Sequence, residues 1–308
     1  MARDTTKRPQ VLSKIIGSVI TLLALHHLKK NPTWKYMKSL NQKIKESIFL
    51  IQRGERLALL MQPAVGYHVA FSGGKDSQVV LELVKMSGVK YKAVYNVTTI
   101  DAPENVYFIR KEYPEVDFYL PKRNFFQLVE RNGMPTKLAR YCCRILKETQ
   151  AAGYTVIDGI RHQESRKRST YKEVSRLHHG LYINNALSNM ENSQFRCVNG
   201  KDKVMLHPIL DWSEFDIWSF IRKKGLAINP CYDDVGRVGC MFCPFGRKKQ
   251  LQFYREKYPR YYERLLRHLQ KYIDTHNGPF SKAEDYYNWW ESKMSISTYQ
   301  KHLLGGNE

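Results

Sequence analysis

A phosphate-binding turn is indicated by six consecutive residues that read Ser72-Gly73-Gly74-Lys75-Asp76-Ser77. The two glycines permit positive φ and let an anion approach the backbone closely. Lys75 adds a positive charge, and the hydroxyls of Ser72 and Ser77 add two hydrogen-bond donors. The GxxxxGK[ST] pattern of a Walker A loop is absent, so the sequence predicts an anion site of another kind.

The flanking elements explain how this turn would be presented. Tyr67–Phe71 is a short apolar run typical of a strand, and Lys75–Val84 carries apolar residues at helical spacing. A helix entered through two glycines has unpaired N–H groups at its N-terminus, where the helix dipole adds partial positive charge. The alternative is an ordinary strand–helix turn.

The turn resembles the pyrophosphate-binding loop of the ATP pyrophosphatase (PP-loop) superfamily, which includes sulfonucleotide reductases, tRNA-thiolating enzymes and the ATPase of DNA phosphorothioation. The resemblance implies ATP and Mg²⁺ as ligands, with Ser72, Gly73, Gly74, Lys75, Asp76 and Ser77 on the phosphates. Lys75 and Asp76 would also act in catalysis. The implied fold is an adenine nucleotide alpha hydrolase-like α/β sheet.

Strand and helix patterns alternate from Tyr67 onward, which indicates a parallel twisted sheet flanked by helices. Further strands are predicted at Tyr91–Val97, Phe118–Leu120 and Thr155–Ile160, with a hairpin of Gln194–Val198 and Lys203–His207. Helices are predicted at Val11–Lys30, Trp34–Met61, from Pro103, at Asn124–Asn132 and at Ser213–Lys224, where Ser213 fits the N-cap and Asp216 fits N3. We expect a helical N-terminal extension over 1–62, a PP-loop domain over 63–246 and a basic, aromatic-rich helical extension over 247–308.

Thr98–Asp101 follows the second predicted strand and therefore belongs beside the glycine turn, where ligands of such sheets bind. Asp101 has two readings. It could cap the helix that begins at Pro103, or it could contact ribose, adenine or Mg²⁺, because the stretch also resembles the second nucleotide loop of the superfamily.

Gly159 lies at the end of the fourth predicted strand, and Arg161 and Arg168 follow it. Both arginines belong to a run, 161–176, in which six of sixteen residues are Arg or Lys. This position favours phosphate binding, with Arg161 and Arg168 holding the phosphates and Arg161 also catalytic. A solvated charged loop is the alternative.

The net charge is +21, from 50 Lys and Arg against 29 Asp and Glu. Such a surface attracts phosphate-rich partners, so DNA or tRNA is expected, with a solvated basic surface as the alternative. Arg247–His268 mixes eight basic residues with tyrosines. This mixture suits contacts to nucleic acid. It also suits an amphipathic helix whose tyrosines face the core. Trp212 and Trp218 are likewise expected to pack in the core.

Six cysteines in 308 residues do not indicate a secreted disulfide framework, and their spacing points to metal in a reducing compartment. The apolar run Ile15–Leu25 is too short to cross a bilayer, and no small-residue cleavage site follows it. We expect a cytoplasmic protein with no membrane contact.

Four of the cysteines form two close pairs, Cys142-Cys143 and Cys240-x-x-Cys243. Adjacent residues on a helix diverge by about 100°, so two neighbouring thiolates cannot both reach one small ion. A cubane accepts both because each sulfur binds a different iron, whereas a zinc site is more often built from two CxxC pairs. The spacing predicts a [4Fe–4S] cluster on Cys142, Cys143, Cys240 and Cys243.

This pairing resembles the cluster arrangement of iron–sulfur sulfonucleotide reductases of the phosphoadenosine phosphosulfate reductase-like family, and the DNA-phosphorothioation ATPases look similar. The resemblance runs from about Tyr67 to Gly246. Those reductases attack with a cysteine on a C-terminal tail, and no cysteine follows Cys243 here. The resemblance therefore supports nucleotide binding and the cluster but not sulfate reduction. Cys231 is an alternative ligand, a sulfur carrier or a buried inert thiol, and Cys197 is expected to be structural.

Together these features predict an enzyme that adenylates a nucleic acid with ATP, releasing pyrophosphate and AMP, and then sulfurates it. The sulfur would come from a donor such as a cysteine desulfurase. One alternative is a phosphoadenosine or adenosine phosphosulfate reductase that borrows a cysteine from elsewhere. Another is a non-catalytic nucleic-acid-binding component. The acceptor, whether DNA, tRNA or a small molecule, and the presence of a homo-oligomer stay open.

Overall fold

The computed structural model describes residues 38–178, 181–184 and 203–304. The chain forms two compact units, Met1–Lys43 and Ile44–Glu308, and the sheet belongs to the second. The predicted helix Val11–Lys30 and Cys197 lie outside the described residues. Within the described ranges, no helix is long and apolar enough to cross a membrane.

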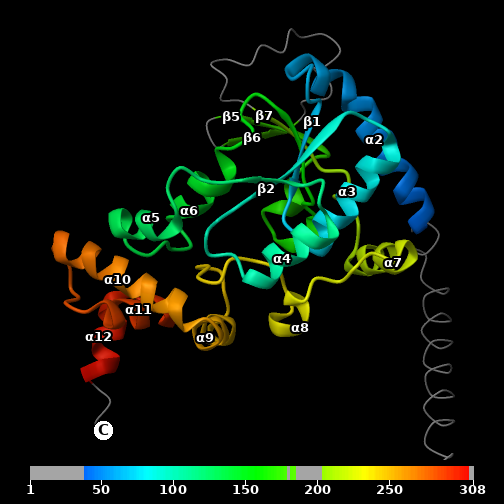
Figure 1. Ribbon diagram of the computed structural model, residues 1–308. Helices are drawn as coiled ribbons and strands as arrows, with labels where there is room; N and C mark the ends of the chain where they lie inside the picture. The colour runs from blue at the N-terminus through cyan, green and yellow to red at the C-terminus, as the bar shows by residue number, and fades with distance from the viewer. Residues whose placement is uncertain (1–37, 179–180, 185–202, 305–308) are drawn as a thin grey trace, which may run out of the picture. The chain divides into compact units, whose positions relative to one another are not determined.

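Seven strands of the described chain form one sheet in the order β3-β2-β1-β4-β7-β5-β6. Figure 1 labels β1, β2, β5, β6 and β7 among them. The strands are β1 (Tyr67–Phe71), β2 (Tyr91–Asn96), β3 (Asp117–Tyr119), β4 (Thr155–Ile157), β5 (Val174–His178), β6 (Leu181–Asn184) and β7 (Lys203–Leu206). β1 pairs in parallel with β2 and β4, β2 with β3, and β4 with β7. The predicted α/β fold with a parallel sheet is confirmed, and β1 lies inside it.

The sheet differs from the prediction at one edge, where β5 and β6 form an antiparallel hairpin beside β7. β5 begins within the basic run 161–176, which we expected to be a loop throughout. β7 has β4 on one side and β5 on the other. The predicted hairpin pairs β7 with Gln194–Val198, a segment outside the described residues. Both edges of β7 are already paired with other strands. The buried residues of β7 suit a strand paired on both sides.

The helices are α2 (Leu40–Met61), α3 (Lys75–Ser87), α4 (Pro103–Glu112), α5 (Phe125–Asn132), α6 (Tyr141–Cys143), η2 (Arg144–Glu148), η3 (His162–Glu164), η4 (Arg168–Thr170), α7 (Glu214–Lys224), α8 (Cys231–Val235), α9 (Lys248–Lys257), α10 (Pro259–Thr275), α11 (Ala283–Ser292) and α12 (Ile296–Leu304). The predicted start of α7 is confirmed, because Ser213 and Asp216 form a reciprocal capping box. Asn124 and Gln127 form another at the start of α5.

Buried polar contacts fix α2 to the sheet and to the segment before α7. The Tyr67 hydroxyl donates to the carbonyl of Ile51 at 2.7 Å. The Ser47 hydroxyl donates to the carbonyl of Pro208 at 2.6 Å and accepts from Trp212 Nε1 at 3.2 Å. Trp212 therefore lies in the core as predicted. Trp218 is only half-buried.

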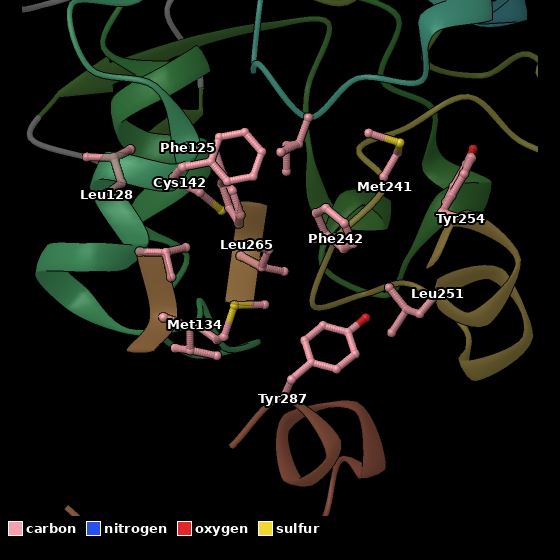
Figure 2. Packing of buried hydrophobic residues seen from close by; sticks show 14 of the residues in the cluster. Phe125, Leu128, Met134, Cys142, Met241, Phe242, Leu251, Tyr254, Leu265 and Tyr287 are labelled. Atoms are coloured by element: carbon pink, nitrogen blue, oxygen red, sulfur yellow. The ribbon is translucent and has the colours of Figure 1, made fainter. Parts of the chain in front are cut away.

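The C-terminal helices share a second apolar core with α5 and α6 (Figure 2). Its labelled members are Phe125, Leu128, Met134, Cys142, Met241, Phe242, Leu251, Tyr254, Leu265 and Tyr287. Tyr254 is buried, and Tyr258, Tyr261 and Tyr262 pack against the cluster. The tyrosines of the basic segment Arg247–His268 thus serve the core, which leaves its charged residues on the outside. The same core holds Cys142 in place.

Candidate nucleotide and cysteine site

The predicted phosphate loop, Ser72–Ser77, connects β1 to α3. Gly73 has a φ of +75°, and a Cβ at this position would lie 2.3 Å from Asn105 Oδ1. Glycine is therefore required both by the turn and by the close neighbour. Gly74 is the N-cap of α3 and makes no side-chain capping bond. The dipole of α3 suits an anion at this end, and the hydroxyl of Tyr232, from elsewhere in the chain, accepts from the N–H of Lys75 there.

The two serine hydroxyls of the loop bond to the loop itself. Ser77 Oγ donates to the carbonyl of Gly74 at 2.8 Å and accepts from the N–H of Ser72 at 3.2 Å. The Ser72 hydroxyl donates to Ser77 Oγ at 3.1 Å. These bonds shape the turn, and the role of both hydroxyls as phosphate donors remains a prediction.

Three side-chain amides hold the carbonyls of the loop. Asn229 Nδ2 and Gln78 Nε2 both donate to the carbonyl of Gly73, at 2.9 and 3.2 Å. Asn105 Nδ2 donates to the carbonyl of Ser72 at 3.2 Å. All three amides are buried. The three amides bind the carbonyl oxygens of the loop and so keep these oxygens turned away from a ligand. In this conformation an anion can bind to the N–H groups of the loop. Sequence reasoning missed them.

Four charged residues meet beside the loop. Arg161 donates from Nε to Asp76 and from Nη2 to Glu214, each at 2.7 Å. Lys75 Nζ lies 2.8 Å from Asp76 Oδ2 and 3.5 Å from Glu214 Oε2. A Cβ on Gly159 would lie 3.1 Å from the backbone of Asp76, so a residue without a side chain permits this approach. The predicted residues Lys75, Asp76, Gly159 and Arg161 are thus brought together, and Glu214 joins them unpredicted.

Arg168 is held one step away from this group. Its guanidinium pairs with Glu164, which in turn accepts from the N–H of Arg161 at 2.9 Å. Arg168 therefore supports the segment that carries Arg161 but does not contact Lys75 or Asp76 in an ion pair. Its predicted contact with phosphate remains a prediction.

A buried array of Asp158, His207 and Ser175 fixes the same segment from behind. His207 Nδ1 lies 2.6 Å from Asp158 Oδ1, and its Nε2 lies 3.1 Å from Ser175 Oγ. Asp158 also accepts from the N–H of Ile160 at 3.2 Å, which turns the chain at the end of β4. His207 and Ser175 are fully buried, so the array positions the backbone and cannot serve as a nucleophilic triad.

Asp101 joins the segment that follows β2 to the segment that carries Cys240. Its carboxylate accepts from the N–H of Thr98 at 2.7 Å, and its backbone forms a β-bridge with Cys240. The N-cap of α4 is Ala102, without a side-chain capping bond, so the predicted capping role of Asp101 is wrong. The carboxylate is used instead to close the Thr98–Asp101 turn.

The two cysteine pairs lie on different elements of the fold. Cys142 and Cys143 end the short helix α6, which continues as the π-helical turn η2, a form common at functional sites. Cys240 Sγ lies 3.5 Å from Thr98 Oγ1. Lys147 is exposed to solvent. The pKa of its ammonium group is raised, first by the negative charge of Cys240 and then by that of Asp101, Cys143 and Cys243.

The thiols differ in acidity. A hydrogen bond from Cys142 lowers the pKa of Cys143 to about 6, with help from the positive charge of Lys147 and Arg140. The same interaction, followed by burial, raises the pKa of Cys142. Within the described residues, no three His, Cys, Asp or Glu side chains are grouped closely enough for a single metal ion. The cluster predicted on the two thiol pairs therefore remains a prediction.

Cys231 lies apart from these thiols in α8. It is buried, and burial raises its pKa to about 11. Its N–H donates to Asn229 Oδ1 at 3.0 Å, next to the phosphate loop. Of the roles considered for this residue, the inert buried thiol agrees best with its environment.

The family model of the phosphoadenosine phosphosulfate reductase domain matches residues 66–245, more than half of the 308 residues. The chain belongs to this family. The matched segment of the reductase-domain family holds the phosphate loop, Arg161, Glu214 and all four paired cysteines. The resemblance predicted from those residues is therefore confirmed.

Individual relatives of this reductase-domain chain carry different names. An uncharacterized protein of Methanocaldococcus jannaschii is 28% identical over 223 residues, which are 68% of this chain and 42% of that protein. Sulfate adenylyltransferase subunit 2 of Rhodospirillum rubrum is 27% identical over 209 residues, 64% of this chain and 69% of that protein. The U34-tRNA thiolase of Methanococcus maripaludis with its [4Fe–4S] cluster has a TM-score of 0.35 and 11% identity, covering 77% of this chain and 82% of that one. The chain spans less than half of the length of the two Methanocaldococcus relatives.

Proposed function

We propose that the chain is an ATP pyrophosphatase-type sulfur-transfer enzyme that adenylates a nucleic-acid substrate and then sulfurates it. The observation that carries the proposal is the closeness of the loop to the segment that carries Cys240, since a Cβ on Gly74 would lie 3.7 Å from the Cβ of Val238. Asp101 pairs through its backbone with Cys240, and its carboxylate holds Thr98, whose hydroxyl contacts the Cys240 thiol. A substrate activated at the loop would therefore be close to the thiols.

In the first step, ATP would bind with its β- and γ-phosphates on the N-terminus of α3. Lys75 and Arg161 now pair with Asp76 and Glu214, and on binding they would turn to the phosphates. An oxygen of the nucleic acid attacks the α-phosphorus, and the bond to pyrophosphate breaks. The charge of the departing pyrophosphate is then stabilised by the two cations. Asp101 would hold Mg²⁺, which neutralises part of the same charge.

In the second step, sulfur replaces the activated oxygen, and AMP leaves. Cys142, Cys143, Cys240 and Cys243 would hold the [4Fe–4S] cluster, which supplies a binding site for the transferred sulfur. The sulfur atom would come from a donor such as a cysteine desulfurase, and a thiol reductant would supply the two electrons that bring persulfide sulfur to the sulfide level. Lys147 balances the negative charge of the thiolates, as the direction of its pKa indicates.

A nucleic acid is favoured as acceptor by a stripe of basic residues on α10. Arg260, Arg264, Arg267 and Lys271 are exposed and follow one another at intervals of four, three and four residues, which places them on one face of the helix. In the described part of the chain, no carboxylate forms an ion pair with any of the three arginines. Unpaired arginines along a helix suit the regularly spaced charges of a phosphate backbone.

Product analysis tests this function. Protein purified without oxygen would be incubated with ATP and DNA or RNA, and pyrophosphate and AMP would be measured. The same preparation would receive adenosine phosphosulfate, and sulfite would be measured. We expect pyrophosphate and AMP that depend on both ATP and nucleic acid. Salt-sensitive nucleic-acid binding with neither set of products would indicate a non-catalytic binding component instead.

The second candidate is a sulfonucleotide reductase, which the family match favours. This reaction needs a thiol that attacks the sulfonucleotide. Cys231 is unsuited to that role because it is buried and its pKa is raised to about 11. The reductase would therefore need a thiol from a partner. Sulfite release in the absence of ATP would replace our proposal with this one.

A further inference from the structure

Tyr232 is the one aromatic residue whose hydroxyl contacts the backbone of the phosphate loop among the residues described. Its hydroxyl oxygen accepts from the N–H of Lys75 at 2.8 Å. The same oxygen would lie 3.5 Å from a Cβ on Gly74. Tyr232 belongs to α8, 157 residues further along the chain. It ends the run Asn229-Pro230-Cys231-Tyr232, which precedes the second cysteine pair and is part of the resemblance to the family, but its spacing assigns the hydroxyl no role.

The position of Tyr232 is fixed by its neighbours. Asn229 donates to the carbonyl of Gly73 at 2.9 Å and accepts from the N–H of Cys231 at 3.0 Å, so the start of α8 is bound to the loop. On the other side, the ring of Trp218 packs edge-on against Tyr232 with centroids 5.4 Å apart. Trp218 Nε1 in turn donates to Glu214 at 2.9 Å. The ring of Tyr232 is thus held between the loop and the Glu214–Arg161 pair.

The hydrogen-bonding capacity of this hydroxyl is half used. It accepts one bond from Lys75, and in the described structure it donates to no acceptor. A phenol has one proton to donate. Burial raises the pKa of Tyr232, so the proton stays on the oxygen at neutral pH. The hydroxyl therefore accepts the bond that the N–H of Lys75 could have donated to an anion. It offers its own proton to the anion in place of that N–H.

We propose that Tyr232 is a phosphate-binding residue of the loop, whose hydroxyl accepts from Lys75 N–H and donates to an oxygen of the pyrophosphate group. This inference rests on the proposed use of Ser72–Ser77 as the pyrophosphate site. It assigns to α8 a direct part in holding the substrate. It also places Trp218 next to a residue whose hydrogen bonding changes when phosphate binds.

The test compares Tyr232→Phe with the wild-type protein in calorimetric binding of inorganic pyrophosphate, ATP and adenosine. The variant keeps the ring and its contact with Trp218 but lacks the hydroxyl. A hydrogen bond to a charged group contributes enough that we expect pyrophosphate and ATP to bind about tenfold or more weakly. Adenosine binding should be unchanged. Tyr107→Phe, at an exposed tyrosine of α4, is the matched control and should bind all three as the wild type does.

Tryptophan fluorescence gives a second measurement. Pyrophosphate should change the emission of the wild-type protein, and Trp218→Phe should remove most of that change. Equal or tighter pyrophosphate binding by Tyr232→Phe would overturn the inference, because the hydroxyl would then only cover the loop. A loss of adenosine binding together with pyrophosphate binding would also overturn it, since the hydroxyl would then support the fold.

The proposed function fails differently. If the wild type binds pyrophosphate and Tyr232→Phe does not, but no pyrophosphate is released from ATP under any condition, the residue assignment stands and the sulfur-transfer reaction is wrong. If the wild-type protein binds neither pyrophosphate nor ATP, both are wrong.

Discussion

Arg161 is a nearly buried cation whose charge is matched by two carboxylates, Asp76 and Glu214. A buried charge is costly unless it is paired. This arrangement keeps Arg161 and Lys75 at the phosphate loop before any ligand arrives. Because Glu214 is half exposed, at 54% of its side chain, it is the partner that can be exchanged for a phosphate at the smaller cost.

The first prediction concerns the charged pair of the loop. Lys75→Ala and Asp76→Ala should each lower pyrophosphate release from ATP by about 100-fold, since removal of one preorganised charged group costs about that much. Iron and sulfide content should be unchanged, because neither residue contacts the cysteines.

Lys85→Ala is the matched control for this pair. Lys85 lies in the last turn of α3, where it pairs with Glu82 and Glu115 at the surface. Its replacement should leave turnover as it is. Normal turnover in both loop variants would mean that Ser72–Ser77 is only a structural turn.

His68 is a buried titratable residue of β1, beside the ring of Tyr154. Burial, followed by the charges of Lys203 and Lys92, lowers its pKa to about 4. At neutral pH the imidazole is uncharged both in the folded and in the unfolded protein. As pH falls below about 6.5, the unfolded protein takes up the proton first, so stability falls until the folded protein titrates near pH 4.

The second prediction follows from this difference. The loss of unfolding free energy that is due to His68 should reach about 3 kcal/mol between about pH 6.5 and pH 4. His68→Phe should remove that part of the acid sensitivity, as measured by denaturant unfolding at a series of pH values. His276→Phe, at an exposed histidine, should retain it. The same pH dependence in His68→Phe and the wild type would contradict the assignment.

The cysteine site depends on two small elements and one bridge. α6 and η2 carry Cys142 and Cys143, and the apolar core of the C-terminal helices holds Cys142 (Figure 2). The segment with Cys240 is joined to Thr98–Asp101 by the β-bridge and by a hydrogen bond from the N–H of Met241 to the carbonyl of Ile100 at 2.9 Å. Two separate parts of the fold therefore carry the thiols.

The third prediction is that the protein purified without oxygen is brown and contains about four iron and four sulfide per chain. Cys142→Ser and Cys240→Ser should both lose the colour and most of the iron. Cys231→Ala, at the buried cysteine of α8, should keep them. Colourless protein with one tightly bound zinc ion would exclude the iron–sulfur assignment.

The whole chain carries a charge of +21, and part of it has local partners. Lys257 pairs with Glu104 and Asp234, and Arg255 pairs with Glu291. Within the described residues the arginines of the α10 stripe have no carboxylate partner, and Arg264 lies over the ring of Phe126, 4.5 Å from its centroid. Positive charge without local partners raises the association rate and affinity for phosphate-rich molecules, and salt weakens both effects.

The fourth prediction is salt-dependent binding of DNA or RNA in the micromolar range at low salt. The logarithm of affinity should fall with the logarithm of salt concentration, with a slope of about −0.9 per neutralised phosphate on duplex DNA and about −0.7 on single strands. Arg260→Glu/Arg267→Glu should weaken binding to all sequences and make this slope shallower. Reversal of the exposed pair Lys248 and Lys249 on α9 should act in the same direction.

Lys111→Glu/Lys224→Glu is the control for these reversals. It makes the same change of charge at exposed positions of α4 and α7 and should weaken binding less. If both double variants weaken binding equally, the total charge determines affinity and the stripe has no special role. If DNA and RNA do not bind at low salt, the nucleic-acid acceptor is wrong.

Features that depend on neighbouring residues could be predicted from the sequence. The limits of β1, the start of α3 and the capping box of α7 agree with the structure because each is set by local backbone chemistry: an apolar run, two glycines, and a serine three residues before an aspartate. Arg161 was placed beside the phosphate loop correctly because strands of a parallel sheet end at a common edge.

Only the tertiary structure determines which distant residues contact the loop and the turns. Glu214 and Tyr232 lie more than 130 residues after the loop they contact. Both stand in runs that resemble the family, but the spacing of those runs does not show which residue meets the loop. The sequence neighbours of Asp101 permit a helix cap. In the structure its carboxylate accepts from the N–H of Thr98, and its backbone forms a β-bridge with Cys240. Such contacts follow from the order of strands and the paths of the connecting segments, which bring distant residues together, and local spacing contains no information about them.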